Sequence, residues 1–433
     1  MKKVSVFVII FMFIFALAGC SNSNGDEADN GVKTSDKPSD SNTADATEVQ
    51  TENSLEGLTL TVGRWGGNDA ETAAFQQMVD EFTASTGVEV QEKVYSDYNT
   101  ELQAELIGGT APDVFYVDAY MAPFYIQQGV LLPLDEDEFE LDQFYEPLKN
   151  AFNKDGNYYA ISKDYSTLAL YYNKKWVNED DVPATLEEIW NGEFLTNLQS
   201  QLSDGAAAMT YNQDLARNMF YAESGGISVI RDDIYSNLSD AQLVNNLTPL
   251  YDAAIAKKIV TPQDLGFGWN GDAFGNEKTA LMIEGNWVLG FLEQNFPDVE
   301  FGVVETPTFS GEKGTMVFTV GYGINANTKE EAAAKVFIKF ATGTKGMATW
   351  TTGAGVLPSR MDVTEATNVE SDPLKVPHIA GAAYATPWQK GTTMDTINNE
   401  YRNYAPSVVS GERTLDEALK KAEDEANSII EAN

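Results

Sequence analysis

Residues 58–69, Leu-Thr-Leu-Thr-Val-Gly-Arg-Trp-Gly-Gly-Asn-Asp, form the stretch that decides the fold. Apolar Leu58, Leu60 and Val62 alternate with threonine, which predicts a β-strand. The glycine-rich segment 63–69 predicts the loop in which that strand ends. Its glycine spacing matches neither of the common phosphate-binding motifs. We therefore interpret it as a loop at the carboxyl end of a strand, where α/β sheets bind their ligands.

The segments that follow alternate between helix and strand. Apolar residues at helical spacing over 75–82 predict a helix that ends at Gly87, and a strand begins at 88–90. A second helix includes 102–106, and a third strand covers 114–117. The order strand, helix, strand, helix, strand predicts a parallel sheet covered by helices.

Later segments predict one further strand and three helix starts. The strand covers 168–172. Each helix start is a threonine with a glutamate three residues later, the capping-box pattern in which the two residues satisfy each other's backbone N–H groups. These patterns occupy 185–188, 328–331 and 414–417.

The composition limits the classes of function. The chain has 433 residues, enough for two domains, and 43% are hydrophobic, so a large core can be buried. Its 66 acidic and 28 basic residues give a net charge of −38, which argues against nucleic acid and against adhesion to anionic lipid. One cysteine, Cys20, and one histidine, His378, allow no intramolecular disulfide, no cysteine-based zinc site and no histidine cluster for a metal. We expect no metal and no cofactor.

The first 54 residues predict export and anchoring. A basic start, an apolar run and small residues make 1–19 a secretory signal peptide. Leu17-Ala18-Gly19-Cys20 is similar to a bacterial lipobox, which implies cleavage before Cys20 and lipidation of its sulfur; a plain signal peptide is the alternative. Residues 20–54 then form a lipidated cysteine and a polar, disordered tether. We expect the protein on the extracellular face of the cell membrane of a single-membrane bacterium.

Five segments of the remaining chain resemble one known family. The most specific is Gly-Gly-Thr-Ala-Pro-Asp-Val-Phe-Tyr at 108–116, completed by Gly-Val-Leu-Leu-Pro-Leu-Asp at 129–135. The other segments are 82–90, 159–164 running into 170–174, 278–287 and 410–419. In this order they resemble the extracellular solute-binding proteins of family 1, the maltose-binding-protein-like group. The resemblance covers nearly all of 55–433.

This resemblance implies an α/β, two-lobed, type II periplasmic-binding-protein-like fold with a hinge and an interlobe cleft. Lobe 1 is expected to comprise 55–162 and 310–360, and lobe 2 to comprise 163–309 and 361–433. The chain is expected to cross between the lobes near 161–165 and to return near 306–315. Such proteins close around a ligand without changing it. The expected partners are a carbohydrate, of di- or oligosaccharide size, and the permease subunits of an ABC importer, with the protein a monomer.

A sugar offers apolar C–H faces to aromatic rings and hydroxyl groups to acids and amides. The loop after the first strand offers Trp65, Asn68 and Asp69, and the third strand ends at Asp118. The resemblance adds Asp164 at the first crossing and Trp287 as a ring that stacks on the sugar. The full set of candidate ligand-binding residues is Trp65, Asn68, Asp69, Asp118, Asp164, Tyr165, Trp269, Glu284, Trp287, Tyr322, Arg360 and Trp388. Contacts from 200–250, such as Asn212 or Asp214, stay open.

Three alternatives remain at this point. One is a surface sensor or adhesin with the same fold. The same fold can bind a polyamine or another small solute, because acids and rings also suit a cation. A secreted glycoside hydrolase needs two carboxylates at a set separation, which a sequence with many acidic residues does not exclude. No carboxylate segment resembles a hydrolase motif, so we expect a binding protein rather than an enzyme.

Overall fold

The computed structural model describes residues 55–202 and 205–432. Residues 1–50 separate from 51–433 as a distinct unit, and only the second unit is described below. The predicted signal peptide, the lipidation site Cys20 and the tether up to residue 54 lie outside the described residues. Within the described ranges, every helix is too short or too polar to cross a membrane.

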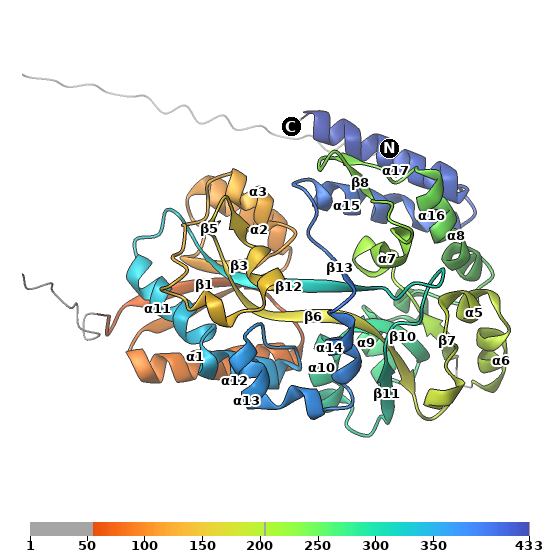
Figure 1. Cartoon of the computed structure of the whole chain (residues 1–433), viewed down its shortest axis with the longest axis horizontal. Helices are drawn as coiled ribbons and strands as arrows, with labels where there is room; N and C mark the ends of the chain where they lie inside the picture. The colour runs from red at the N-terminus through yellow and green to blue at the C-terminus, as the bar shows by residue number, and fades with distance from the viewer. Residues whose placement is uncertain (1–54, 203–204, 433) are drawn as a thin grey trace, which may run out of the picture. The chain divides into compact units, whose positions relative to one another are not determined.

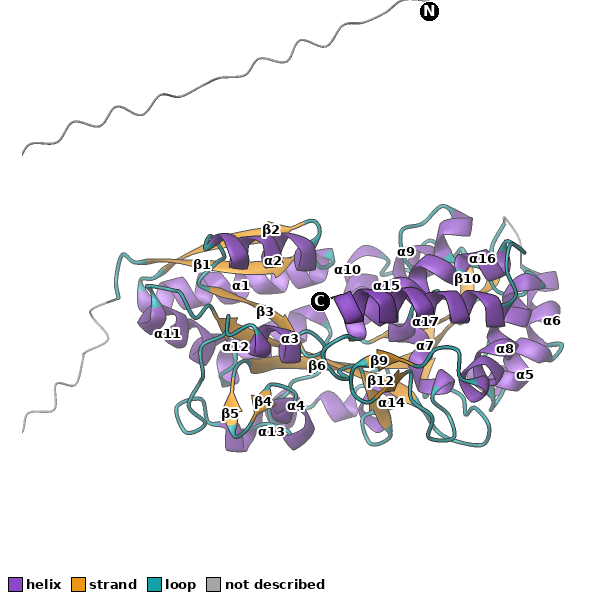
Figure 2. Ribbon diagram, turned by 90° about the horizontal axis from the view of Figure 1, so that it is seen from above, coloured by secondary structure: helices purple, strands orange, loops and turns teal. Residues whose placement is uncertain are grey.

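The described chain consists of strands and helices that interleave along the sequence (Figures 1 and 2). The strands are β1 Thr59–Trp65, β2 Glu89–Tyr95, β3 Val114–Asp118, β4 Asn153–Lys154, β5 Asn157–Tyr158, β6 Ile161–Asn173, β7 Ala207–Thr210, β8 Ile230–Arg231, β9 Tyr235–Ser236, β10 Thr279–Gly285, β11 Phe301–Val304, β12 Thr315–Ile324 and β13 Ala385–Pro387. The α-helices are α1 Asp69–Thr86, α2 Tyr98–Gly108, α3 Ala122–Gln127, α4 Glu146–Asn150, α5 Leu186–Asn191, α6 Phe194–Gln201, α7 Leu215–Ala222, α8 Ala241–Ile255, α9 Asn270–Gly275, α10 Trp287–Asn295, α11 Glu331–Ala341, α12 Thr344–Ala354, α13 Met361–Thr367, α14 Val376–Gly381, α15 Met394–Tyr404, α16 Pro406–Val409 and α17 Leu415–Ala432.

The predicted parallel sheet is confirmed in the first part of the chain. Strand β1 pairs in parallel with β2 on one side and with β3 on the other. Helices α1 and α2 pack against these strands, as Figure 2 shows. Because the three strands run in the same direction, the ends of β1 and β3 meet at one edge, which brings Trp65 and Asp118 to the same side of the sheet.

Strands β6 and β12 join the two halves of the described unit (Figure 1). The first half of β6 pairs antiparallel with β12, and its second half pairs antiparallel with β10 and β11. All thirteen residues of β6 are buried. The strand is therefore longer than the predicted segment 168–172, because neighbours cover it on both faces and polar residues such as Lys163 and Asp164 are buried within it.

Two large apolar cores flank these strands. One core joins β1, β3, α1, α11 and α12 through residues between Leu60 and Ile161 and between Val320 and Val363. The other core joins the second half of β6 to α5, α7, α8, α15 and α17. The described unit thus has two lobes, each with its own core, and strands that run from one lobe into the other.

The predicted helix starts are confirmed at two of three positions. The hydroxyl groups of Thr185 and Thr414 accept hydrogen bonds from the N–H groups three residues later, at 3.1 and 3.2 Å. The prediction at Thr328 was wrong in register, because α11 begins only at Glu331. Thr328 instead accepts from the Glu330 N–H and donates to Asp113, so it fixes the preceding turn.

Candidate functional site

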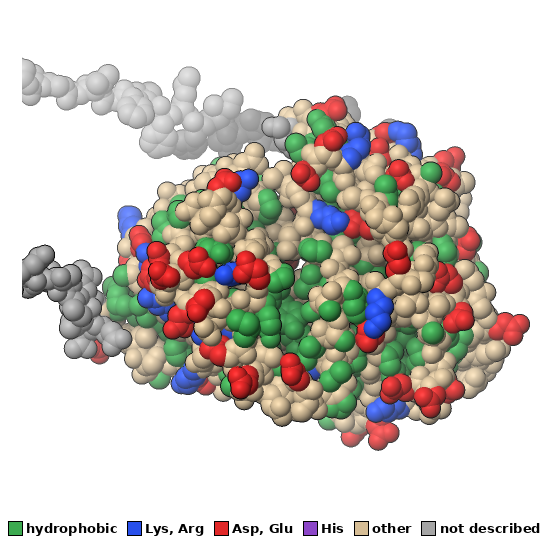
Figure 3. All heavy atoms as spheres, viewed as in Figure 1, with side chains coloured by type: hydrophobic (Ala, Val, Ile, Leu, Met, Phe, Trp, Pro, Cys, Tyr) green, Lys and Arg blue, Asp and Glu red, His purple; other side chains and the backbone are tan. Residues whose placement is uncertain are grey.

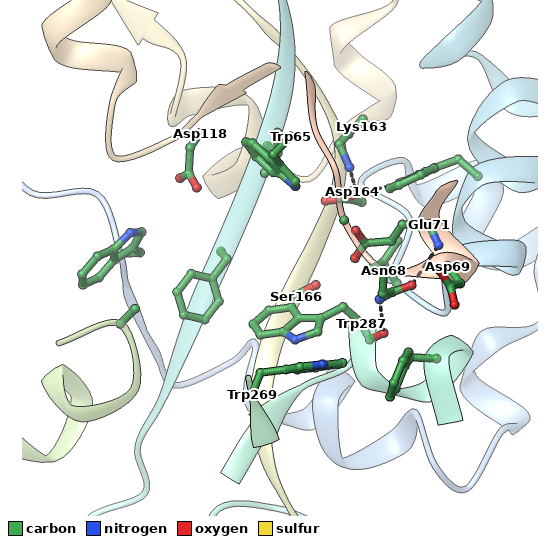
Figure 4. Close-up of a pocket in the computed structure, with 18 of the residues that line it drawn as sticks. Trp65, Asn68, Asp69, Glu71, Asp118, Lys163, Asp164, Ser166, Trp269 and Trp287 are labelled. Atoms are coloured by element: carbon green, nitrogen blue, oxygen red, sulfur yellow. Dashed lines mark hydrogen bonds and ion pairs between the residues drawn. The ribbon is translucent and has the colours of Figure 1, made fainter. Parts of the chain in front are cut away.

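A central cavity of about 690 Å³ lies where β1, β3, β6 and β12 meet α1, α10 and α12 (Figure 4). Five of the seven tryptophans of the chain line it, which are Trp65, Trp269, Trp287, Trp350 and Trp388. Figure 3 shows apolar side chains gathered near the middle of the visible face, where β6 and β12 run in Figure 1. A cavity of this size with this lining accommodates a ligand with apolar faces.

The aromatic rings form a connected wall. The ring centroids of Trp287 and Phe318 are 5.6 Å apart, and those of Phe318 and Trp388 are 6.3 Å apart. Trp269 packs against Phe291 at 4.8 Å. Each ring is held by a neighbouring ring, so the wall presents fixed apolar surfaces to a ligand.

The cavity floor holds a buried ion pair from β6. Lys163 pairs with Asp164, and the Trp350 indole N–H donates to the same Asp164 carboxylate at 2.6 Å. The Lys163 ammonium also lies 3.9 Å from the centre of the Trp350 ring. A β-bulge explains why two neighbouring residues face one cavity: Val320 of β12 opposes Asp164, the next residue Gly321 opposes Ser162, and Lys163 is the extra residue.

The loop after β1 is held by both backbone and side-chain contacts. The buried Arg64 guanidinium donates to the carbonyls of Trp65 and Gly66 at 2.8 and 2.9 Å. Asn68 caps α1 by accepting from the Glu71 N–H at 2.9 Å, and its amide donates to the Trp287 carbonyl at 3.3 Å. The last bond joins the loop after β1 to the start of α10, which follows β10 and packs against α1.

A second ion pair orients a cation on the opposite wall. Arg217 of α7 pairs with the buried carboxylate of Glu284 at 3.2 Å. The Arg217 guanidinium carbon lies 5.0 Å from the centre of the Trp287 ring. Glu284 therefore acts on the central cavity through Arg217, because its own side chain lines a neighbouring cavity instead.

Three further carboxyl groups of the cavity have altered acidity. The pKa of Asp118 is raised to about 7, chiefly by burial. A hydrogen bond from the Tyr120 N–H lowers this pKa, the nearby charge of Asp164 raises it, and the charge of Lys163 lowers it. Burial also raises the pKa of Glu71, whereas the nearby charge of Lys163 lowers it. Burial raises the pKa of Asp272, where Trp269 lowers it and Asp69 raises it. The cavity thus holds several carboxyl groups whose charged form is disfavoured by burial.

A model of the bacterial extracellular solute-binding protein family matches residues 77–377, more than half of the chain. The chain belongs to this family.

Three curated relatives of this solute-binding protein have names that state a ligand. An arabinooligosaccharide-binding protein of Halalkalibacterium halodurans is 28% identical over 56% of this chain and 57% of that protein, less than two thirds of its length. A galactooligosaccharide-binding protein of Bacillus subtilis is 24% identical over 80% and 78% of the two chains. The diacetylchitobiose-binding protein DasA of Streptomyces coelicolor is 22% identical over 86% and 90%.

Solved structures share the two-lobed fold. The maltose/maltodextrin-binding domain MalE of Bdellovibrio bacteriovorus, bound to maltotriose, superposes with a TM-score of 0.75 at 21% identity, covering 86% of this chain and 100% of that one. An ABC substrate-binding protein of Listeria monocytogenes in complex with cycloalternan gives a TM-score of 0.73 at 23% identity, covering 86% and 99%. At these identities the likeness establishes the fold.

The central cavity of this solute-binding protein brings together eight of the twelve predicted site residues. These are Trp65, Asn68, Asp69, Asp118, Asp164, Trp269, Trp287 and Trp388. Figure 4 shows the labelled members around one space: Trp65 and Asp118 lie on one side, Asn68 and Asp69 on another, and Trp269 and Trp287 below. They come from segments spread over more than 300 residues, so the fold rather than the local sequence assembles them.

The other four predicted residues lie outside the central cavity. Tyr165 points to the opposite face of β6 from Asp164 and Ser166, and packs against Leu148 and Leu357. Glu284 lines a neighbouring cavity and pairs with Arg217, which lines both cavities.

Tyr322 and Arg360 are also turned away from the cavity. Tyr322 is buried in the core of the first lobe, with its ring 5.3 Å from that of Tyr116. Arg360 is buried and pairs with Glu140 and Asp362 at 3.1 and 2.9 Å. Both side chains have structural partners that keep them from a ligand.

Several other lining residues are not among the twelve that the sequence predicted. The additional polar members are Glu71, Ser166, Arg217 and Asp272, and the additional rings are Phe291, Phe318 and Trp350. Ser166 is 5% exposed, and its side chain forms no hydrogen bond within the described residues. Glu71 carried a signal, since it lies three residues after Asn68 in a capping pattern. No sequence pattern indicated Arg217 or Trp350, because only the fold brings α7 and α12 to the cavity.

The region 200–250, left open by the sequence, contributes a neighbouring cavity. This cavity of about 340 Å³ includes Asn212 and Asp214 in its lining and shares Arg217 and Trp269 with the central cavity. Asp214 also caps α7 by accepting from the Ala216 N–H at 2.7 Å. A ligand in the central cavity therefore has room to extend toward α7.

Removing the cation of the floor pair is expected to destabilise the protein. The substitution Lys163→Met leaves the buried Asp164 carboxylate without its partner, which should cost about 3 kcal/mol of the free energy of unfolding, measured by urea denaturation. The matched substitution Lys175→Met breaks an exposed pair with Glu277 and should cost under about 1 kcal/mol. Equal losses in the two variants would contradict the buried pair.

The raised pKa of Asp118 predicts a pH dependence of stability. The carboxyl group stabilises the fold most when protonated, and this contribution is lost as pH rises from the ordinary value of 3.8 through about 7. Asp118→Asn should therefore gain stability relative to the unsubstituted protein between pH about 4 and about 7, measured by urea denaturation. For the control Asp80→Asn, at an exposed position, the dependence of stability on pH should be parallel to that of the unsubstituted protein. A parallel profile for Asp118→Asn would refute the assignment.

Proposed function

We propose that this solute-binding protein binds a carbohydrate of di- or oligosaccharide size in the central cavity and delivers it to an ABC importer. The observation that carries the proposal is the gathering of five tryptophans with acids and an amide around one cavity. Aromatic faces suit the C–H faces of sugar rings, and carboxylates and amides suit their hydroxyl groups. The names of the three curated relatives, each a binder of an oligosaccharide or of diacetylchitobiose, support the same ligand class.

We propose that the lobes close over the ligand by bending at β6 and β12. Lobe 1 would comprise 55–162 and 310–360, and lobe 2 would comprise 163–309 and 361–433. The separate cores support a division into two lobes, and they depart from these bounds at Met316, which lies in the core of lobe 2, and at Val363, which lies in the core of lobe 1. The bond between the Asn68 amide and the Trp287 carbonyl links the starts of α1 and α10, which this division assigns to different lobes. Permease subunits would then recognise the closed form.

The proposal includes binding without catalysis. The only histidine, His378, is fully buried and lies against the Tyr171 hydroxyl at 2.7 Å and the Thr167 carbonyl at 2.8 Å. Burial lowers its pKa to about 3, so it is neutral and engaged in packing β6 against α14. A purified protein that shortens oligosaccharides on incubation would oppose the proposal and favour a hydrolase.

Loss of one stacking ring is expected to weaken sugar binding. A thermal-shift screen against neutral sugars, amino sugars and polyamines identifies the ligand, and calorimetry then measures its affinity. Trp287→Ala should cost at least about 2 kcal/mol of binding free energy, because the ring is lost from the wall. The matched variant Trp176→Ala removes a ring outside the central cavity and should keep the affinity. Unchanged binding in Trp287→Ala, or a response to polyamines alone, would oppose the carbohydrate site.

We also propose that a lipid on Cys20 holds the protein at the outer face of the cell membrane. Cys20→Ala should then release the protein from membranes while its sugar affinity stays the same, since the ligand site lies beyond residue 64. Fractionation after expression in a single-membrane bacterium measures the release. A variant that remains in the salt-washed membrane fraction would oppose the anchor.

A further inference from the structure

A side cavity opens from the central cavity at Trp65 and Asp118. Its volume is about 400 Å³, and its lining comes from the end of β1, the segment 96–99 after β2 and the end of β3. Trp65 and Asp118 line both cavities. A ligand in the central cavity can therefore place a substituent or a further ring in the side cavity.

The side cavity is lined by carboxyl groups that form no ion pair within the described residues. Its charged residues are Asp97 and Asp118, and neither forms an ion pair within the described part of the chain. No lysine or arginine is part of its lining. In contrast, the two cations of the central cavity, Lys163 and Arg217, are already paired with carboxylates. Asp118, which lines both cavities, is thus a carboxyl group of the site that has no ion-pair partner within the described residues.

A third carboxylate, Asp395 of α15, faces the same region. Burial raises its pKa, while Tyr120, Asn399 and Arg402 lower it and Asp97 raises it. Asp118, whose pKa is also raised by burial, faces Asp164 and Lys163 on its other side. Ionising these acids together is unfavourable in the absence of a counter-charge, so an entering cation would be stabilised by them.

Aromatic rings complete the lining. Trp65, Tyr98 and Tyr120 line the side cavity, and the Trp65 and Tyr98 ring centroids are 5.3 Å apart. The Tyr120 ring lies 5.6 Å from that of Trp388, which lines the central cavity. Ring faces attract cations, and the attraction grows where water is excluded. Rings and carboxylates around one space form a suitable site for an ammonium group.

We propose that the side cavity binds a protonated amino group, and that the ligand is an oligosaccharide that carries at least one amine. The inference rests on the proposed function and narrows its ligand to the amino sugars. A neutral sugar that closed this cavity would leave Asp97 and Asp118 desolvated without a counter-charge. An ammonium group would donate charge-assisted hydrogen bonds to Asp118 and contact the face of Trp65. The unbonded hydroxyl group of Ser166 remains available in the central cavity for a sugar hydroxyl.

The test compares sugars that differ only at the amine. Calorimetry measures the affinity of the full-length protein for the β-1,4-linked glucosamine trimer, its N-acetylated form and cellotriose, with maltotriose and spermidine as further probes. The glucosamine trimer should bind at least roughly tenfold more tightly than its N-acetylated form and cellotriose. Asp118→Asn should remove most of this preference, whereas Asp80→Asn, which removes the same charge at an exposed position, should retain it. Asp97→Asn should reduce the preference in part.

The possible results separate the inference from the proposed function. Preferential binding of cellotriose, the N-acetylated trimer or maltotriose would overturn the amino-group site and keep a carbohydrate ligand. A preference for the amine that Asp118→Asn leaves intact would also overturn the site. Binding of spermidine with no binding of any sugar would instead overturn the proposed function. Binding of none of the five probes would count against the amino-sugar ligand.

Discussion

The burial of β6 along its whole length is the constraint on which the rest of the structure depends. One strand pairs within the sheets of both lobes and contributes residues to both cores. Its middle carries Lys163, Asp164 and Ser166, polar residues that burial would penalise without partners. The ion pair, the Trp350 indole and the hydrogen bonds from Ser162 and Thr319 to the Asp164 carbonyl satisfy most of these groups. Ser166 stays unbonded toward the cavity, so the strand that joins the lobes also forms the floor of the site.

The cavity walls offer a ligand two kinds of contact, aromatic faces and charged side chains. The tryptophans supply fixed apolar faces, and their positions follow from packing against one another and against Phe291 and Phe318. The cations of the central cavity are held by Asp164 and Glu284, so they act as oriented hydrogen-bond donors rather than as free positive charges. The acids beside Trp65 lack such partners. Asp69, Glu71 and Asp272 of the central cavity also form no ion pair within the described residues, so acids without a cation partner line both cavities of a chain of net charge −38.

The extent to which the sequence predicted the structure depends on how local each feature is. Alternation and turn residues predicted β1, α1 and β3, and therefore the edge at which Trp65 and Asp118 meet, because these patterns act over a few residues. The resemblance to a family added Asp164 and Trp287. The sequence did not reveal the bulge at Lys163, which depends on the register between β6 and β12. Nor did it reveal that Arg360 turns toward Glu140 or that Tyr322 enters a core, since both depend on contacts between distant segments.

The most direct test of the account is a crystal structure of the protein with the tightest-binding sugar from the screen. The account predicts electron density for the sugar in the central cavity, with a sugar ring against Trp287 and hydroxyl groups within hydrogen-bond distance of Asp69, Asp118 or Ser166. Density for the sugar on another surface, or a central cavity closed by its own side chains while the sugar is bound elsewhere, would contradict the account.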